Sequence, residues 1–124
     1  MITGIGVDIV QIQRMEHWVT NKKLLERFFH TDELAVILQK GKNAAQNLAA
    51  RFAAKEAFGK ALGTGLANIE LKDIIIVNKE NGKPEVKLTG TAQKALEKSG
   101  ANRVFISLSH EKENAIAMIV LEGA

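Results

Sequence analysis

The opening of the chain alternates apolar and small or polar positions in a pattern typical of a β-strand. Residues 2–12 read I-T-G-I-G-V-D-I-V-Q-I and are rich in β-branched side chains. Because successive side chains of a strand point to opposite faces, Ile5, Val7 and Ile9 share one side. The other side carries Gly4, Gly6, Asp8, Val10 and Ile12. The two glycines before Asp8 leave room on its face for something bulky.

Helical patterns follow this strand. Two short helices are predicted over residues 12–19 and 24–29, and Thr31 is a plausible N-cap for a third helix that runs to about residue 39. A long helix is predicted over 43–62, because the segment is rich in alanine and Gly63 is well placed to end it.

The second half of the chain favours hairpins. A strand over 69–77 and a returning strand over 85–88 flank Asn81-Gly82, a strong hairpin signal. Thr89 is expected to cap a helix that runs to about Lys98, and residues 103–109 and 115–121 form a second apolar pair. Grouped helices and hairpins predict an α+β fold in which a small, mostly antiparallel sheet packs against the long helix and several short ones.

Composition narrows the functional classes. A chain of 124 residues predicts one domain, and 46% hydrophobic with 25% charged residues is ordinary for a soluble protein. Cysteine is absent, which excludes disulfides and thiolate metal sites, and no signal peptide or membrane span is expected. The net charge of +3 favours an anionic partner, but aromatic residues make up only 5%, which disfavours base stacking on nucleic acid.

Asp8 is the first candidate for chemistry. A carboxylate among apolar neighbours is costly unless an arginine or lysine, backbone N–H donors or a metal ion compensates it. The pattern alone leaves a structural salt bridge and a functional site about equally supported.

The predicted long helix carries the second candidate. Glu56 and Lys60 lie one turn apart, and the simpler interpretation is an ordinary helix pair worth about 0.2–0.5 kcal/mol. The alternative makes Glu56 a second carboxylate near Asp8 and Lys60 a phosphate contact, because two carboxylates and a polyphosphate commonly hold Mg²⁺.

Three further segments allow two interpretations each. Residues 63–65 resemble a phosphate loop but follow a helix, whose C-terminal dipole repels anions, so a glycine cap is equally supported. Residues 107–110 favour phosphate binding at a strand end over a serine nucleophile. A basic cluster with interleaved Met15 and Trp18 is either a solvated face or a docking patch for an acidic partner; it comprises Arg14, Lys22, Lys23 and Arg27.

Together these segments resemble the holo-(acyl-carrier-protein) synthases, the small bacterial 4′-phosphopantetheinyl transferases. That family's G-x-D-I-V is matched at residues 6–10, followed by Arg14, and its R-F-A-x-K-E-A-x-x-K-A-x-G-x-G is matched at 51–65. Its G-K-P is matched at 82–84, and its S-x-S-H followed by A-x-A at 107–110 and 115–117. The resemblance covers essentially the whole chain. The sequence departs from it at Gln11, Gly59 and Asn114.

The resemblance implies a phosphopantetheinyl transferase-like fold and a reaction. Coenzyme A would donate its phosphopantetheine arm to a serine of apo acyl carrier protein, releasing 3′,5′-ADP and giving the holo carrier for fatty acid synthesis. Asp8 and Glu56 would hold Mg²⁺, Lys60 would add positive charge near the phosphates, and Arg14 would meet the carrier protein. The nucleotide would be walled by Lys60, Gly63, Thr64, Gly65, Gly82, Lys83, Pro84, Ser109 and His110.

The absence of cysteine suits a reducing cytosol, and the resemblance implies a homotrimer with sites between subunits. The general base stays open between Glu56 and a metal-bound water. Two rival functions remain: a basic nucleic-acid-binding module, which gives Asp8 no purpose, and a relative that binds nucleotide or carrier but has lost catalysis. Both carboxylates expected to bind the metal are present, which argues against that loss.

Overall fold

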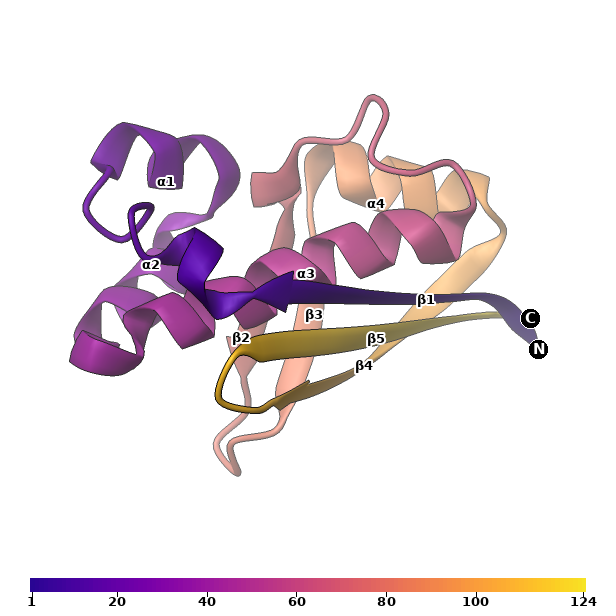
Figure 1. Ribbon diagram of the computed structural model, residues 1–124. Helices are drawn as coiled ribbons and strands as arrows, with labels where there is room; N and C mark the ends of the chain where they lie inside the picture. The colour runs from indigo at the N-terminus through magenta and orange to yellow at the C-terminus, as the bar shows by residue number, and fades with distance from the viewer.

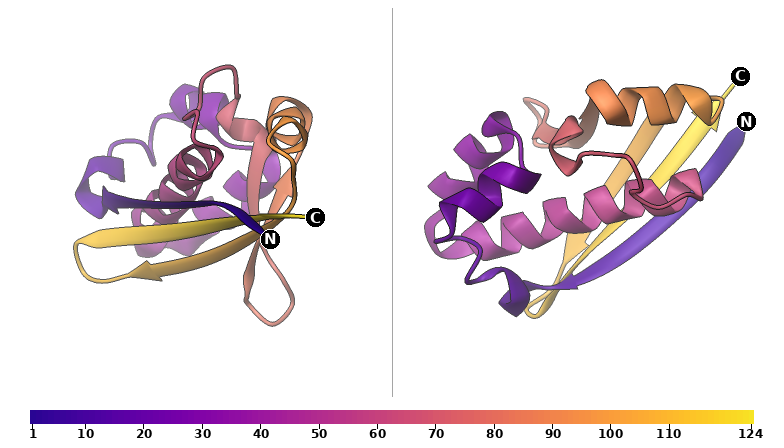
Figure 2. Two further views of the ribbon diagram at one scale, coloured as in Figure 1. Left: turned by 90° about the vertical axis from the view of Figure 1, so that its right-hand side faces the viewer. Right: turned by 90° about the horizontal axis from the view of Figure 1, so that it is seen from above.

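The computed structural model describes residues 1–124 and contains two antiparallel sheets. The larger sheet has the order β1-β5-β4, formed by β1 (Ile2–Gln11), β4 (Ala101–His110) and β5 (Asn114–Gly123). The long helix α3 (Ala44–Leu62) crosses one face of this sheet, and the other helices lie on the same side (Figures 1 and 2). The α+β prediction is confirmed, but the strands divide into two sheets rather than one.

The contact between β1 and α3 is close because two glycines allow it. A Cβ placed on Gly4 would collide with the carbonyl oxygen of Ala61, and one on Gly6 would collide with that of Ala57. The bulky neighbour predicted from these glycines is therefore the backbone of α3. The predicted faces of β1 are also confirmed, since Ile5, Val7 and Ile9 are exposed on the side away from the helix; their exposed fractions are 59%, 52% and 57%.

The second sheet pairs β2 (Ile74–Asn78) with β3 (Pro84–Leu88). Gly82, in the connecting turn, has φ of 85°, a conformation that favours glycine. The prediction of a strand from Ile69 was wrong at its start. Residues 71–73 form the 3₁₀ turn η3 (Leu71–Asp73), and a buried lysine, Lys55, binds the carbonyls of Leu71 and Ile74 there. Helix α4 (Gly90–Lys98) then begins after Thr89, which occupies the predicted N-cap position, but the Thr89 hydroxyl donates to Asp73 Oδ1 and caps no helix N–H group.

The N-terminal helices differ from the prediction in their bounds: the first ends earlier, at Met15, and the second begins earlier, at Lys22. They are η1 (Ile12–Met15), α1 (Lys22–Phe28), α2 (Thr31–Ile37) and η2 (Leu38–Asn43). The N-cap of α2 is His30, not Thr31: its Nδ1 accepts the backbone N–H of Asp32 at 3.0 Å. Glu33 accepts the backbone N–H of His30 at 3.1 Å, which completes a capping box. None of the helices has the length and apolar character needed to cross a bilayer.

Candidate active site

Asp8 and Lys60 form the centre of the candidate site. The Lys60 ammonium donates to Asp8 Oδ1 at 2.9 Å and to the carbonyl oxygen of Val7 at 3.1 Å. The Asp8 side chain is 18% exposed and that of Lys60 is 55% exposed. Of the possible partners for Asp8, the structure therefore contains the lysine. An ion pair with such an exposed partner contributes at most about 1 kcal/mol, so it leaves Asp8 able to bind another cation.

Glu56 lies one helical turn before Lys60 and takes part in no ion pair. Partial burial, followed by the negative charge of Asp8, raises the pKa of Glu56, while Lys60 and Arg14 oppose that rise. The electrostatic influence of Asp8 and Arg14 shows that residues distant in sequence gather around this carboxyl. Two carboxylates that repel each other form a place where a cation relieves unfavourable charge.

The donor set fits Mg²⁺ bound together with a substrate. No group of three or more acidic or histidine side chains gathers in the structure, so a cage made only of protein ligands is absent. Mg²⁺ commonly uses one or two carboxylates and completes its coordination with water and substrate phosphates. The oxygens of Asp8 and Glu56 match that requirement. Burial and then the negative charge of Asp8 raise the pKa of Glu56, and a cation held by both carboxylates would relieve their repulsion.

Residues 63–65 form a helix cap that folds back onto α3. Gly63 has φ of 83° and Gly65 has φ of 68°, and the N–H of Gly65 donates to the carbonyl oxygen of Gly59 at 3.0 Å. Thr64 is exposed. The glycine cap is therefore present, and Thr64 and Gly65 lie at the C-terminal end of α3, close in sequence to Lys60. Nothing in this geometry prevents the loop from also contacting a phosphate.

The remaining predicted nucleotide contacts lie beside the opposite edge of the sheet. Strand β1, which carries Asp8, is one edge and β4 is the other. The hairpin with Gly82, Lys83 and Pro84 lines a hollow of about 380 Å³ against residues 106–108 of β4. One chain therefore does not bring this hairpin together with Asp8 and Lys60.

The end of β4 is also separated from Lys60. His110 Nδ1 lies 2.8 Å from the side-chain amide of Gln46, near the start of α3. Gln46 and Lys60 are fourteen residues apart on this helix, which is about 21 Å along its axis. Ser109 pairs with Ile116 on the exposed face of the sheet, whereas His110 pairs with the buried Ala115. The predicted alternation is confirmed, and no Ser–His pair forms.

The basic cluster is only partly as predicted. Arg14 is exposed on η1, and its charge reaches Glu56. Met15 is fully buried, and the Trp18 ring packs 5.4 Å from that of Phe52. Met15 therefore belongs to the core and the half-buried Trp18 packs against it, so a docking patch here would consist mainly of the exposed basic residues.

Comparison with known proteins identifies the family. A model of the 4′-phosphopantetheinyl transferase superfamily matches residues 4–118. The chain belongs to this superfamily. It is 55% identical over 123 residues to a holo-[acyl-carrier-protein] synthase of Treponema denticola, covering 99% of this chain and 100% of the relative.

Solved structures agree with this assignment. A holo-[acyl-carrier-protein] synthase of Neisseria meningitidis has a TM-score of 0.87 and 38% identity, covering 98% of this transferase and 99% of that chain. The Bacillus anthracis enzyme, in complex with CoA (3′,5′-ADP), has a TM-score of 0.82 and 36% identity, covering 100% and 99%. The transferase is thus an enzyme with the fold of this family, as the resemblance implied.

Sequence reasoning missed a buried charged network beside the site of the transferase. The ammonium of Lys55 donates to Glu33 Oε1 at 2.8 Å, and both side chains are fully buried. Burial lowers the pKa of Lys55, and Glu33 opposes that effect. Arg51 is buried as well, and its Nε has no hydrogen-bond partner. The signal that could have revealed Glu33 is its position three residues after a cap, where a glutamate closes a capping box.

Gly59, one of the departures from the family pattern, has a packing role in the transferase. A Cβ at this position would lie 2.9 Å from the backbone carbonyl carbon of Gly65 and from Leu66 Cγ. The absent side chain lets the loop after α3 approach the helix closely.

Proposed function

We propose that the protein transfers the 4′-phosphopantetheine arm of coenzyme A to a serine of apo acyl carrier protein in a Mg²⁺-dependent reaction. The products would be 3′,5′-ADP and a holo carrier for fatty acid synthesis. The observation that carries the proposal is the grouping of Asp8, Glu56 and Lys60 at the junction of β1 and α3, within a chain of this family. Residues 1–124 would act as one transferase domain in the cytoplasm.

Each residue of the proposed site would have a separate role in binding or catalysis. Asp8 and Glu56 would hold the cation, which supplies charge neutralisation at the diphosphate when bound. Lys60, already at this point with its ammonium, would stabilise negative charge on the leaving phosphate. The N–H groups of Gly63 and Gly65 already donate to the carbonyl oxygens of Lys60 and Gly59, so the exposed Thr64 would make the loop's contact with the nucleotide. Arg14 would orient an acidic carrier protein toward the site.

The separation of the predicted contacts supports an active site shared between copies. A nucleotide that touches Lys60 and also the hairpin at 82–84 or His110 needs residues from both edges of the sheet. One chain supplies these at opposite edges, so a neighbouring copy would supply the second group. The face of the sheet away from α3 exposes a set of large apolar side chains that suits such packing; these are Ile5, Val7, Ile9, Phe105, Ile116 and Met118. We propose a homotrimer.

The direct test is incubation with coenzyme A, MgCl₂ and an apo acyl carrier protein, followed by intact-mass spectrometry of the carrier. The expected result is a mass gain of one phosphopantetheine, lost on adding EDTA and restored by Mg²⁺. Asp8→Asn and Glu56→Gln should each abolish the gain, whereas Glu97→Gln, on the exposed side of α4, should not. No gain with any divalent metal would refute the transfer, and wild-type rates in both site variants would refute the two-carboxylate role.

A further inference from the structure

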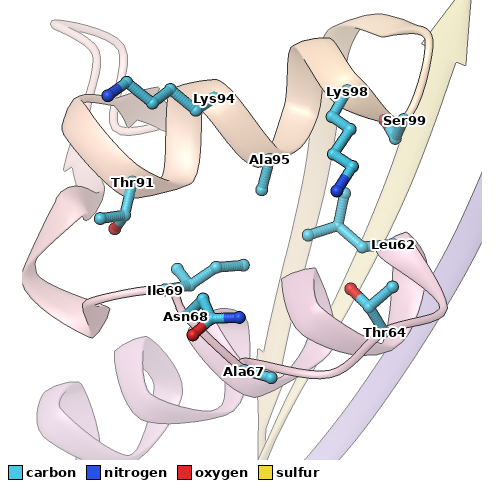
Figure 3. Close-up of a pocket in the computed structure, with 10 residues that line it drawn as sticks. All are labelled: Leu62, Thr64, Ala67, Asn68, Ile69, Thr91, Lys94, Ala95, Lys98 and Ser99. Atoms are coloured by element: carbon cyan, nitrogen blue, oxygen red, sulfur yellow. The ribbon is translucent and has the colours of Figure 1, made fainter.

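A pocket lies between α4 and the segment 63–69 that follows α3 (Figure 3). Its volume is about 510 Å³, within the range of about 300–1,000 Å³ that small organic ligands occupy. Its walls include neither Asp8, Glu56 nor Lys60, and Thr64 is the only wall residue among the proposed nucleotide contacts. The pocket is therefore largely separate from the proposed catalytic site.

The interior of the pocket is lined by apolar side chains from three segments. Leu62 ends α3, Ile69 follows the loop, and Ala95 lies in the middle of α4; all three point into one hollow in Figure 3. Ile69 is 9% exposed, so its contact with the pocket is anchored in the core. An apolar body of a ligand would find contact on several sides here.

The charge at the pocket is entirely positive. Lys94 and Lys98 lie one turn apart on α4, both are exposed, and neither takes part in an ion pair. No aspartate or glutamate lines the pocket. Like charges at this spacing on a helix are unfavourable, so an anion bound in the pocket would relieve part of the repulsion between the two lysines. Figure 3 shows the Lys98 ammonium directed toward Leu62, across the hollow, whereas that of Lys94 lies at the outer rim.

These observations specify the chemistry of the ligand. We infer that the pocket binds a small amphiphilic anion, whose apolar body packs on Leu62, Ile69 and Ala95. Its carboxylate or phosphate head meets the Lys98 ammonium, and Lys94 adds positive charge at the rim. The aliphatic stem of Lys98 extends the apolar wall while its ammonium meets the head. This binding does not depend on the transfer reaction.

The test is a titration of the full chain with octanoate, followed by ¹⁵N-NMR. We expect shifts of the backbone amides of Leu62, Ile69 and Ala95, and clearly weaker binding of the uncharged 1-octanol. Octyl phosphate, tested separately, distinguishes a phosphate-headed from a carboxylate-headed ligand as the preferred source of the anion. Lys94→Gln and Lys98→Gln should each weaken octanoate binding by about two- to fivefold, because exposed charge contacts are modest.

Matched controls separate this site from the rest of the molecule. Lys87→Gln, an exposed lysine on β3, should bind octanoate as the wild type does. Saturating coenzyme A should leave the octanoate shifts in place. The inference is overturned if neither anion shifts these amides, if 1-octanol binds as tightly as octanoate, or if coenzyme A displaces octanoate. The mass assay for transfer is independent of each of these outcomes.

Discussion

Replacing Lys55 with methionine tests the buried network beside the site. Methionine has a similar length but offers no donor, so Glu33, which is 0% exposed, loses its only ion-pair partner. The carbonyl oxygens of Leu71 and Ile74 lose a donor at the same time. Glu33 would still accept the backbone N–H groups of His30 and Ile76, but its charge would lose its direct ion pair and keep only the more distant guanidinium of Arg51 as a nearby cation.

The burial of this ion pair sets the expected loss in the free energy of unfolding. Leaving one partner of a buried pair uncompensated costs about 3–5 kcal/mol. The lost contacts to the two carbonyls belong to the same network and are not added separately. Because a domain of this size is stable by about 5–15 kcal/mol, Lys55→Met should remove a large part of the free energy of unfolding.

Urea unfolding monitored by circular dichroism gives the measurement, with midpoint and slope fitted for each variant. The double variant Lys55→Met/Glu33→Gln should regain part of the loss, because it no longer buries a lone charge. Lys87→Met, at an exposed position, should stay within about 0.5 kcal/mol of the wild type. A loss below about 1 kcal/mol in Lys55→Met would refute the reasoning.

Three further predictions concern the site and its supports. Burial, then the charge of Asp8, raises the pKa of Glu56, so its ionised form opposes folding once the pH exceeds the usual glutamate range near about 4.3. Without metal, Glu56→Gln should melt higher than the wild type at pH 7 and equally below about pH 4; equal melting at pH 7 would contradict this. Gly59→Ala gains about 1 kcal/mol in helix preference, but overpacking against Gly65 costs about 1–3 kcal/mol. The Gly59→Ala variant should therefore be less stable than the wild type and should show faster hydrogen exchange at the Gly65 amide. A more stable variant with unchanged exchange would show that the loop moves to accept the extra methyl group at no cost. Burial raises the pKa of Asp73, but hydrogen bonds from Thr91 and Thr89 outweigh it and lower the pKa. The lowered pKa of Asp73 stabilises the fold above about pH 4, and this stabilisation is lost as the pH falls further. The urea midpoint of Asp73→Asn should therefore change less with pH below about pH 4 than that of the wild type. If the midpoints of both proteins fell equally with pH, the lowered pKa would be contradicted.

Local signals predicted much of the fold. The alanine-rich segment and Gly63 fixed both ends of α3 within one residue, and alternation placed the side chains of β1 and β4 on the correct faces. The start of β2 was predicted too early because Lys55, distant in sequence, binds the backbone there and holds a 3₁₀ turn. Strand propensity alone contains no information about such a contact.

The candidate site was less accessible to sequence reasoning. Asp8 was recognisable as a charge needing compensation, but its partner Lys60 is 52 residues away, and several cations could have served. The ion pair between Glu33 and Lys55 could not be predicted from sequence, because each residue fits the pattern of an exposed helix surface. Only the packing of α2 beside α3 buries both side chains. The apolar pocket beside α4 likewise requires three segments to meet.

The backbone contact of Gly4 and Gly6 with α3 limits how the carboxylate pair can vary. Elsewhere in the molecule, flexible side chains can repack after a mutation. Here the backbone of β1 contacts the backbone of α3 directly, and no side chain lies between them that could adjust its conformation. Asp8 follows this contact by two residues, and Glu56 precedes it by one. An alanine at position 6 would therefore move the carboxylate of Asp8 away from that of Glu56. Transfer activity would then depend on whether a cation could still bind both carboxylates at the larger separation.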